Sequence, residues 1–266
     1  MSITSYTFAI GTDPEVMCVS NGNPVSPIGL IGGTKKNPMR TTHGWVQEDN
    51  VALEGNIEPC YDRQAWVTTI SNLLSDFDEI LKPLDMQVSI KASQLFPDDQ
   101  LLHPLAKLAG CEPDFNAWGL CPNEKPDLSS SNLRVFGGHI HISSDLFKDP
   151  MDRIYFTRVM DLCAGIPSVL MDKDLDRKKL YGKAGCHRPK FTARGDTFDG
   201  VEYRTLSNFW LGNTNLMGWA YDVVDMAVKR YDELKSNIPV VVESVINTND
   251  RLTAEKLVKD YELLVV

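Results

Sequence analysis

Four short segments of this chain carry carboxylates or imidazoles at even spacing, a pattern that could hold a metal ion. The residues concerned are Asp13, Glu15, Glu54, Glu58, His139, His141 and Glu202, the last of them near Arg204. So many carboxylates repel one another strongly in a low-dielectric environment unless a cation lies among them. Oxygen ligands with a few imidazoles suit Mg²⁺ or Mn²⁺ better than zinc, whose structural sites prefer thiolates. The pattern therefore predicts a Mg²⁺ or Mn²⁺ site on one face of a sheet.

Each pair also has a simpler explanation. Asp13 and Glu15 could form a turn at a strand end, and Glu54 and Glu58 could lie on the solvated face of an edge strand. The two histidines could be buried in a hydrophobic core, and Glu202 and Arg204 could form ion pairs on the sheet. Asp114, in the PDFNAWG stretch, fits a structural turn better than a contact with a substrate amine. We favour a site because all the simpler explanations would have to hold together on one small fold.

The segment from 173 to 194 is cationic, although the whole chain has a formal net charge of -9. A glycine-jointed cationic loop suits polyphosphate chemistry, because arginines neutralise charge on a transferring phosphoryl group. A solvated basic loop is the alternative. The chain has neither G-x-x-x-x-G-K-[ST] nor G-x-G-x-x-G, which excludes P-loop and Rossmann sites. The basic residues are Lys173, Arg177, Lys178, Lys179, Lys183, Arg188, Lys190 and Arg194, against Asp174 and Asp176.

Composition limits the class of protein. The chain has 266 residues, 42% of them hydrophobic, and we expect one domain over 1–266 with a sizeable core. The negative net charge argues against general nucleic-acid binding. The six cysteines are scattered without a C-x-x-C pair, and we find neither a signal-like start nor a long apolar run. We therefore expect a soluble cytoplasmic protein with free thiols and no membrane partner.

The elements that must position these residues follow from hydrophobic periodicity. Alternating or short apolar runs predict strands over 6–10, 51–59, 86–92, 134–143 and 201–209. Helical spacing predicts helices over 63–82, 150–171, 213–236 and 253–263, with Pro167 bending the second of them. The segments 21–44, 97–132 and 172–200 read as loops, with a short helix over 101–109. Strands with one polar face beside amphipathic helices predict an α+β layer with a largely antiparallel sheet.

Five motifs in order resemble one enzyme family. They are GTDPE at 11–15, EGNIEP at 54–59, GHIHIS at 138–143, YGKAGCHR at 181–188 and EYR at 202–204. Together they resemble the glutamine synthetase and glutamate-cysteine ligase superfamily, most closely its phage-type carboxylate-amine ligases (type 2). The resemblance covers residues 11 to about 210. It implies a glutamine synthetase-like open half-barrel of mainly antiparallel strands backed by helices, with Mg-ATP and two or three metal ions in a funnel.

The resemblance also implies roles for single residues. The implied metal ligands are Asp13, Glu15, Glu54, Glu58, His139 and Glu202. The implied nucleotide and phosphate contacts are His141, Ser143, Lys183, Arg188 and Arg194. The residues implied to act on the reacting groups are Arg188, Arg194, Arg204 and Glu54, with Arg204 on the substrate carboxylate. Gly137 and Gly138 would let the nucleotide approach the strand closely. Two departures from glutamine synthetase concern the metals: Asp13 replaces a glutamate, and Glu54 and Glu58 lie unusually close in sequence.

The implied reaction is amide formation from a small-molecule or peptide carboxylate and an amine. The carboxylate takes the γ-phosphoryl group of ATP to form an acyl phosphate, and the amine then displaces phosphate. Two other functions stay open: a phosphotransferase like the guanidino kinases, which share this architecture, and a non-catalytic nucleotide-binding phage protein. The identity of both substrates and the oligomeric state are open too, and a phage-encoded enzyme would act in the host cytoplasm.

Overall fold

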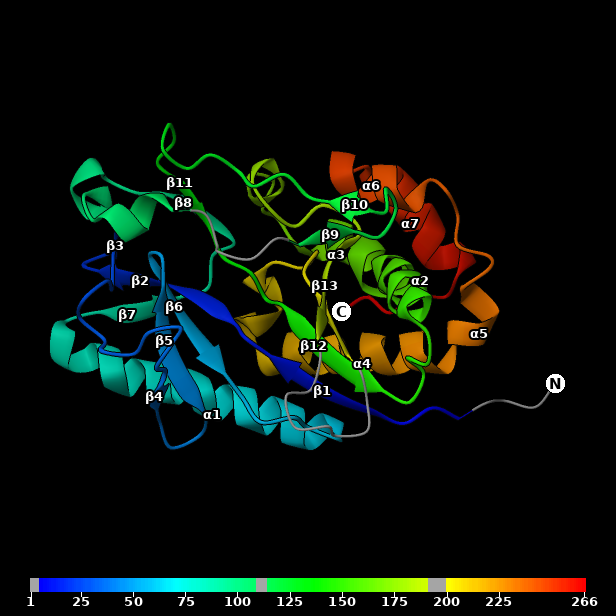
Figure 1. The fold of residues 1–266 in the computed structure, drawn as a ribbon, viewed down its shortest axis with the longest axis horizontal. Coiled ribbons are helices and arrows are strands. Elements are labelled where there is room, and N and C mark those ends of the chain that lie inside the picture. The colour runs from blue at the N-terminus through cyan, green and yellow to red at the C-terminus, as the bar shows by residue number, and fades with distance from the viewer. Residues whose placement is uncertain (1–4, 109–113, 191–199) are drawn as a thin grey trace.

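The computed structural model describes residues 5–108, 114–190 and 200–266. Its strands form two six-stranded sheets and a small two-stranded one (Figure 1). The first sheet has the order β1 (Phe8–Thr12), β12 (Ile140–Ser144), β14 (Gly200–Tyr203), β13 (Cys186–Lys190), β9 (Phe115–Asn116) and β10 (Cys121–Pro122). The second has the order β3 (Asn23–Val25), β2 (Glu15–Ser20), β6 (Ala52–Asn56), β5 (Trp45–Asp49) and β4 (Met39–Arg40), with β7 (Gln87–Ser89) on β2. β8 (Ser93–Leu95) pairs with β11 (Leu133–Val135).

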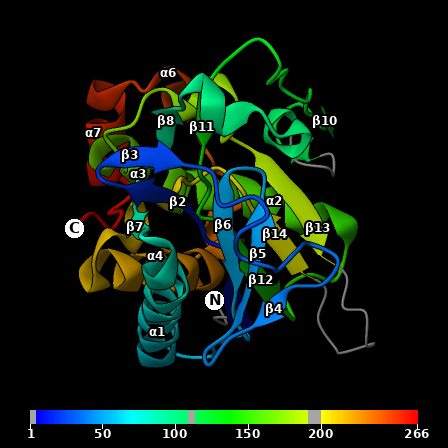
Figure 2. The same ribbon diagram turned by 90° about the vertical axis from the view of Figure 1, so that its left-hand side faces the viewer.

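Helices complete the fold. The longer ones are α1 (Arg63–Leu81), α2 (Pro150–Met160), α3 (Ile166–Met171), α4 (Thr214–Lys229), α6 (Val242–Thr248) and α7 (Arg251–Asp260), with the single turn α5 (Tyr231–Leu234) after α4. Figure 2 shows α1 and α4 on the same side of the strands. Every pairing between named strands in the described ranges is antiparallel. The predicted α+β class is confirmed, with the antiparallel strands curled as a half-barrel and accompanied by helices.

Helix α1 shows how local sequence builds the framework. The Asp62 side chain caps it by accepting from Ala65 N at 2.8 Å, which satisfies one of the free N–H groups of the first turn. Five of its apolar residues are fully buried, among them Trp66, which stacks on Trp210 with ring centroids 5.6 Å apart. Gly55 on β6 faces this helix, and a Cβ there would lie 2.6 Å from Phe77. The glycine therefore lets the helix pack close to the strand, which leaves Glu54 on the other face.

Residues 13–15 lie where the two large sheets meet. The chain leaves β1, passes through Asp13 and Pro14, and enters β2 at Glu15. Glu15 N donates to Gly137 O at 3.0 Å, and Gly55 N donates to Pro14 O at 3.0 Å. These bonds tie the connection to β6 of the second sheet and to the segment that leads into β12 of the first.

Several predicted elements differ from the structure. The strand predicted over 134–143 is two strands in different sheets, because the chain bends at Gly137 and Gly138 between β11 and β12. The segment predicted as a loop over 21–44 contains β3 and β4, and β2, β5 and α6 were not predicted. The helix expected over 101–109 is instead two short 3-10 turns, η2 (Asp98–Leu101) and η3 (Pro104–Lys107). Short strands with glycine and proline form through pairing with distant segments, which local periodicity does not record.

The helix predicted over 150–171 is present but contains a π turn, η4 (Asp161–Gly165), between α2 and α3. Pro167 has no N–H to donate to the carbonyl four residues earlier, and the wider turn absorbs this loss. By length and composition Pro150–Met171 could cross a membrane, but 72% of its most apolar window is buried inside the protein, as in the core helix of a soluble protein. Each cysteine in the described ranges is free.

The two glycines before His139 are needed for internal packing. A Cβ at Gly137 would overlap the His139 ring, and a Cβ at Gly138 would overlap the Trp210 indole and lie 2.6 Å from Ser207 O. Trp210 Nε1 also donates to Gly138 O at 3.1 Å. The space beside these two glycines is therefore filled by His139 and Trp210, where we had expected a nucleotide to approach the strand.

We predict that Gly138→Ala destabilises the protein by about 1 to 3 kcal/mol, the usual cost of overpacking a core. The added methyl group would displace the Trp210 indole and weaken its bond to the backbone. Urea denaturation followed by circular dichroism measures the change. Gly212→Ala is the matched control, because a Cβ there would meet only Leu216, at 3.7 Å. Equal stability of the two variants would contradict the packing argument.

Candidate functional site

Strand register places three predicted residues in one row across the first sheet. His141 on β12 lies opposite Gly11 on β1 and opposite Glu202 on β14. Glu202 in turn lies opposite Arg188 on β13. Side chains at directly paired positions share one face of a sheet and lie within contact distance. The row therefore brings together an imidazole, a carboxylate and a guanidinium from segments far apart in the sequence.

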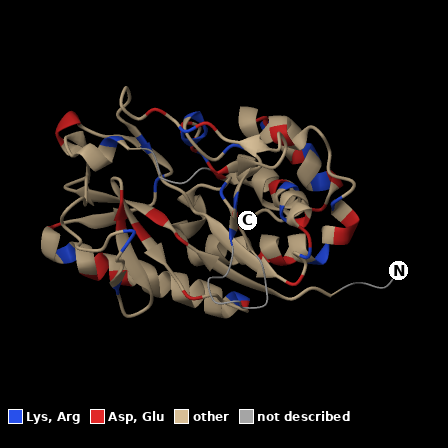
Figure 3. Cartoon of the chain, viewed as in Figure 1, with Lys and Arg blue, Asp and Glu red and all other residues tan. Residues whose placement is uncertain are grey.

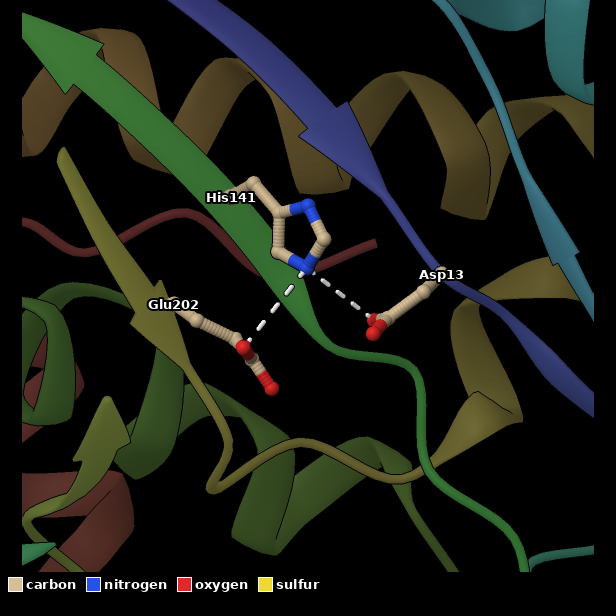
Figure 4. Close-up of side chains that lie close together, drawn as sticks. All are labelled: Asp13, His141 and Glu202. Carbon is tan, nitrogen blue, oxygen red and sulfur yellow. Dashed lines mark ion pairs between the residues drawn. The ribbon is translucent and has the colours of Figure 1, made fainter. Parts of the chain in front are cut away.

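Asp13 completes a cluster at one end of this row (Figure 4). Its Oδ1 lies 3.2 Å from His141 Nε2, which lies 4.0 Å from Glu202 Oε2. One ligand atom from each residue lies within 4.8 Å of the others. All three atoms are buried and have no hydrogen bond of normal geometry, although Lys190 Nζ lies 2.9 Å from Glu202 Oε2 and His139 Nδ1 lies 3.2 Å from Asp13 Oδ1. Unsatisfied buried polar atoms are costly, and a divalent cation would satisfy all three at once. The donor set therefore fits Mg²⁺ or Mn²⁺.

Neighbouring charges keep both carboxylates of the cluster ionised. Burial alone would raise the pKa of Asp13, but His141 and His139 outweigh it and hold that pKa well below its usual range. Burial and the Asp13 charge raise the pKa of Glu202, but Arg204 and the two histidines more than offset them, and the pKa falls to about 2. Two charged carboxylates are thus available for a metal ion at neutral pH.

A second pair of carboxylates, on the second sheet, lines a pocket together with Asp13. His141 and Glu202 lie outside the lining of this pocket. Glu15 on β2 is directly opposite Glu54 on β6. The Glu15 Oε2 atom accepts from Gly137 N at 2.6 Å. Glu54 is 5% exposed, and its Oε2 has no hydrogen-bond partner. Burial and, to a smaller extent, the negative charge of Asp13 raise the pKa of Glu54 well above the usual range. This pair would suit a further cation beside the first.

Guanidinium groups form the opposite side of the pocket. Arg204 Nη1 pairs with Glu202 Oε1, and Arg204 Nε lies 3.3 Å from Asp114 Oδ2. Arg188 Nη1 lies 3.5 Å from Glu202 Oε1. Arg177 is buried and donates to Thr205 O at 2.9 Å and to Arg204 O at 3.2 Å. Burial alone would lower the pKa of Arg204. The charges of Glu202 and Asp13 outweigh this effect and raise the pKa above its usual range, so the guanidinium stays charged.

The pocket between the sheets therefore has an acidic side and a basic side. Figure 3 shows acidic residues on strands of the second sheet and basic residues toward β13 and the turn η5 (Arg177–Lys179). The acidic lining consists of Asp13, Glu15, Asp49 and Glu54, the basic lining includes Lys35, Arg177, Arg188 and Arg204, and the apolar lining includes Leu128, Val135, Phe136 and Leu180. Such a pocket can take metal ions and an anionic ligand together.

The two histidines have different surroundings, although both lie close to Asp13. His141, implied as a nucleotide contact, is the imidazole of the Asp13 and Glu202 cluster. His139, implied as a metal ligand, is 4% exposed, and its Nδ1 lies 3.2 Å from Asp13 Oδ1 and 3.3 Å from Arg204 Nη1. Both rings face Asp13, but His139 Nδ1 also lies within hydrogen-bond distance of the Arg204 guanidinium, which can donate to it.

Three other predicted residues are not brought to the cluster, and a fourth lies outside the described residues. Glu58 is exposed beyond the end of β6, because the chain turns there to pair Cys60 with Ile10. Lys183 is exposed, and its backbone carbonyl accepts from the Thr205 hydroxyl at 3.1 Å. Ser143 lies on β12 between Ala9 and Gly200, outside the pocket lining. Arg194 lies outside the described residues.

Three residues near the site were not assigned to it from the sequence. Arg177 and Lys190 belong to the basic segment, which was the available signal, and Lys190 Nζ lies 2.9 Å from Glu202 Oε2. Asp114, expected in a turn, pairs with Arg204. No spacing rule connects Asp114 to a residue 90 positions away, so only the folded chain could reveal this pair.

Comparison with known proteins finds distant structural similarity. No family model matches the chain, and no curated protein matches it. Among solved structures, GmaS without ligand is 10% identical with a TM-score of 0.43, over 98% of this chain and 70% of that one. GmaS in complex with ADP is 10% identical with a TM-score of 0.41, over 98% and 71%. Glutamine synthetase from Plasmodium falciparum is 10% identical with a TM-score of 0.38, over 83% and 52%. The chain is thus similar, at low identity, to glutamine synthetase-like structures.

Proposed function

We propose that this chain is an ATP- and Mg²⁺-dependent carboxylate-amine ligase, of the phage-type (type 2) that its motifs resemble. The observation that carries the proposal is the buried cluster of Asp13, His141 and Glu202, which faces the guanidinium groups of Arg188 and Arg204. Phosphoryl transfer from ATP needs this combination, because metal ions and arginines together neutralise the phosphate oxygens.

The donor atoms support a metal-dependent reaction. Asp13, His141 and Glu202 would hold one ion, and Glu15 with Glu54 would hold a further one. A bound Mg²⁺ ion would supply charge neutralisation and orientation for the phosphate oxygens of ATP. Oxygen-rich donors suit this hard cation, and the thiols in the described ranges lie outside the cluster.

The basic side of the pocket would orient the two anionic groups. We assign Arg188 to the ATP phosphates and Arg204 to the substrate carboxylate, with Arg177 buried behind Arg204. A planar guanidinium binds phosphate or carboxylate with two parallel hydrogen bonds, which fixes direction as well as charge. Held this way, a carboxylate oxygen would lie in line with the γ-phosphorus.

The proposed reaction has two steps. A carboxylate oxygen attacks the γ-phosphorus, ADP leaves, and an acyl phosphate forms. The amine nitrogen then attacks the acyl carbon, the carbon–oxygen bond breaks, and inorganic phosphate leaves. The amine loses one proton, and we assign its acceptance to the Glu54 carboxylate. Burial and the Asp13 charge raise the pKa of this group, which makes its ionised form a stronger base.

We also propose that the substrates are a small-molecule or peptide carboxylate and an amine, and that the protein works in the cytoplasm. The acidic side of the pocket would attract a cationic amine. The net charge of -9 supports the absence of a nucleic-acid partner.

The test is metal-dependent ADP formation in the presence of both substrates. We expect purified protein with Mg-ATP and a mixture of carboxylates and amines to release ADP and to form a product whose mass is the sum of two substrates less water. Omitting the metal or the amines should stop product formation. A stable phosphorylated product would instead favour the phosphotransferase. Absence of ADP formation with host metabolite extract would contradict the ligase.

A further inference from the structure

Asp161 is a buried carboxylate outside the pocket lining that accepts four hydrogen bonds. It begins the π turn η4 and is 0% exposed. Its Oδ2 accepts from Trp118 Nε1 at 2.7 Å and Gly185 N at 2.6 Å. Its Oδ1 accepts from the Tyr203 hydroxyl at 2.8 Å and the Thr205 hydroxyl at 3.1 Å. A carboxylate with so many donors ties its partners firmly together.

The four donors come from three segments that carry site residues. Tyr203 and Thr205 lie immediately before and after Arg204. Gly185 immediately precedes β13, whose residue Cys186 accepts from Arg204 N through its carbonyl at 2.9 Å. Trp118 follows β9, the strand that begins next to Asp114, the partner of Arg204. Each bond to Asp161 therefore anchors a residue beside Arg204 or in a segment that contacts Arg204.

Gly165, at the end of the π turn, makes room for this network. A Cβ at Gly165 would lie 2.6 Å from Ile246 Cδ1, 3.0 Å from the Tyr203 hydroxyl and 3.5 Å from Asp161 Oδ1. The turn itself is closed by the bond from Ile166 N to Asp161 O, one residue wider than an α-helical bond. π turns are rare and often occur at functional sites. Here the turn and its glycine allow a strand hydroxyl to reach a carboxylate on the helix.

We propose that Asp161 is a positioning residue for Arg204. By fixing Tyr203 and Thr205 on both sides of Arg204, together with Gly185 beside it, the carboxylate holds the guanidinium between Glu202 and Asp114. The positioning of Arg204 by Asp161 is a property of the ligand-free chain. The consequence of this positioning for catalysis rests on the proposed function.

The chemistry of the four donors suggests a conservative variant. Both partners of Oδ2 are N–H groups that can only donate, whereas both partners of Oδ1 are hydroxyls that can also accept. The Thr205 hydroxyl additionally lies 3.1 Å from Lys183 O, to which it can donate. An asparagine can therefore place its oxygen toward the N–H groups and its amide toward the hydroxyls. Alanine would remove the acceptor of both N–H groups and of the Tyr203 hydroxyl, and would leave Thr205 with Lys183 O.

The test measures hydrogen exchange of the Arg204 Nε–H group by NMR in ¹⁵N-labelled, ligand-free protein, with the signal assigned by R204K. We expect D161A to accelerate this exchange at least about tenfold, equivalent to losing one good hydrogen bond, and D161N to stay within about threefold of the unmodified protein. D152A is the matched structural control, because Asp152 belongs to the capping box of α2, the helix that runs into the π turn, and accepts from the Tyr231 hydroxyl at 2.9 Å. We expect D152A to lower stability without changing the Arg204 signal.

G165A keeps the test decisive if D161A does not fold. We expect it to accelerate Arg204 exchange in the same direction, because the added methyl group presses on the Tyr203 hydroxyl. Unchanged exchange in D161A, or in G165A where D161A does not fold, would overturn the proposal, as would an equal change in D152A. In active protein the same ranking should appear in kcat/KM for the carboxylate substrate. Failure of the unmodified protein to form ADP would count against the ligase alone, since the NMR measurement needs no ligand.

Discussion

Replacing Glu202 with glutamine is expected to abolish metal-dependent ADP formation and to lower Mn²⁺ affinity at least about a hundredfold. Residues that only contact the metal ligands usually contribute about 10- to 100-fold, and we expect a direct ligand to contribute more. Glu202 is fully buried, and its two oxygens contact His141, Arg188, Lys190 and Arg204. A neutral amide would remove one charge and one ligand oxygen. It would also present N–H groups to the surrounding cations.

The same substitution should destabilise the fold. Removing one partner of a buried ion pair leaves the other charge uncompensated, which typically costs about 3 to 5 kcal/mol. In E202Q the uncompensated group is Arg204, which would keep Asp114 as its remaining carboxylate partner at 3.3 Å. Calorimetric Mn²⁺ titration and urea denaturation measure the two effects separately.

Glu58 offers the matched control for this prediction. It is an exposed glutamate beyond the end of β6, so E58Q removes the same charge without touching the cluster. We expect E58Q to match the unmodified protein in Mn²⁺ affinity and stability. If E202Q bound Mn²⁺ as tightly as E58Q, the cluster of Asp13, His141 and Glu202 would not be the metal site.

The second large effect is expected from His141→Ala, which should reduce Mn²⁺ affinity about 10- to 100-fold, while His139→Ala reduces it less. His141 Nε2 has no hydrogen-bond partner and lies beside Asp13 Oδ1. His139 Nδ1 is instead shared between Asp13 and the Arg204 guanidinium, which disfavours a cation at that nitrogen.

Stability should rank the two variants in the opposite order. His139 is 4% exposed and packs against Gly137, so its removal leaves a cavity, whereas the His141 side chain is 24% exposed. We therefore expect H139A to unfold at a lower urea concentration than H141A. His43→Ala is the control, because His43 pairs with Asp76 at 2.8 Å, away from the pocket. A greater loss of Mn²⁺ affinity in H139A would instead support the metal role that the family resemblance implies for His139.

Local spacing was sufficient for part of the framework and part of the site. The capping Asp62 and the apolar stripe after it predicted helix α1, and alternation predicted that Leu53 and Gly55 face away from Glu54. Even spacing also predicted that the rings of His139 and His141 share a side, and both contact Asp13. These features depend on a few consecutive residues, whose side-chain directions follow from helix or strand geometry.

The amino-acid sequence by itself therefore determined the α+β class, the main helices and the acidic, imidazole and basic residue types of the site. Only the tertiary structure decided that Glu202 lies between His141 and Arg188, that Glu58 turns away, and that Asp161 supports Arg204. The physical reason is that cross-strand register and burial depend on pairing between distant segments. The free energy of that pairing comes from the whole core, and local periodicity carries no record of it.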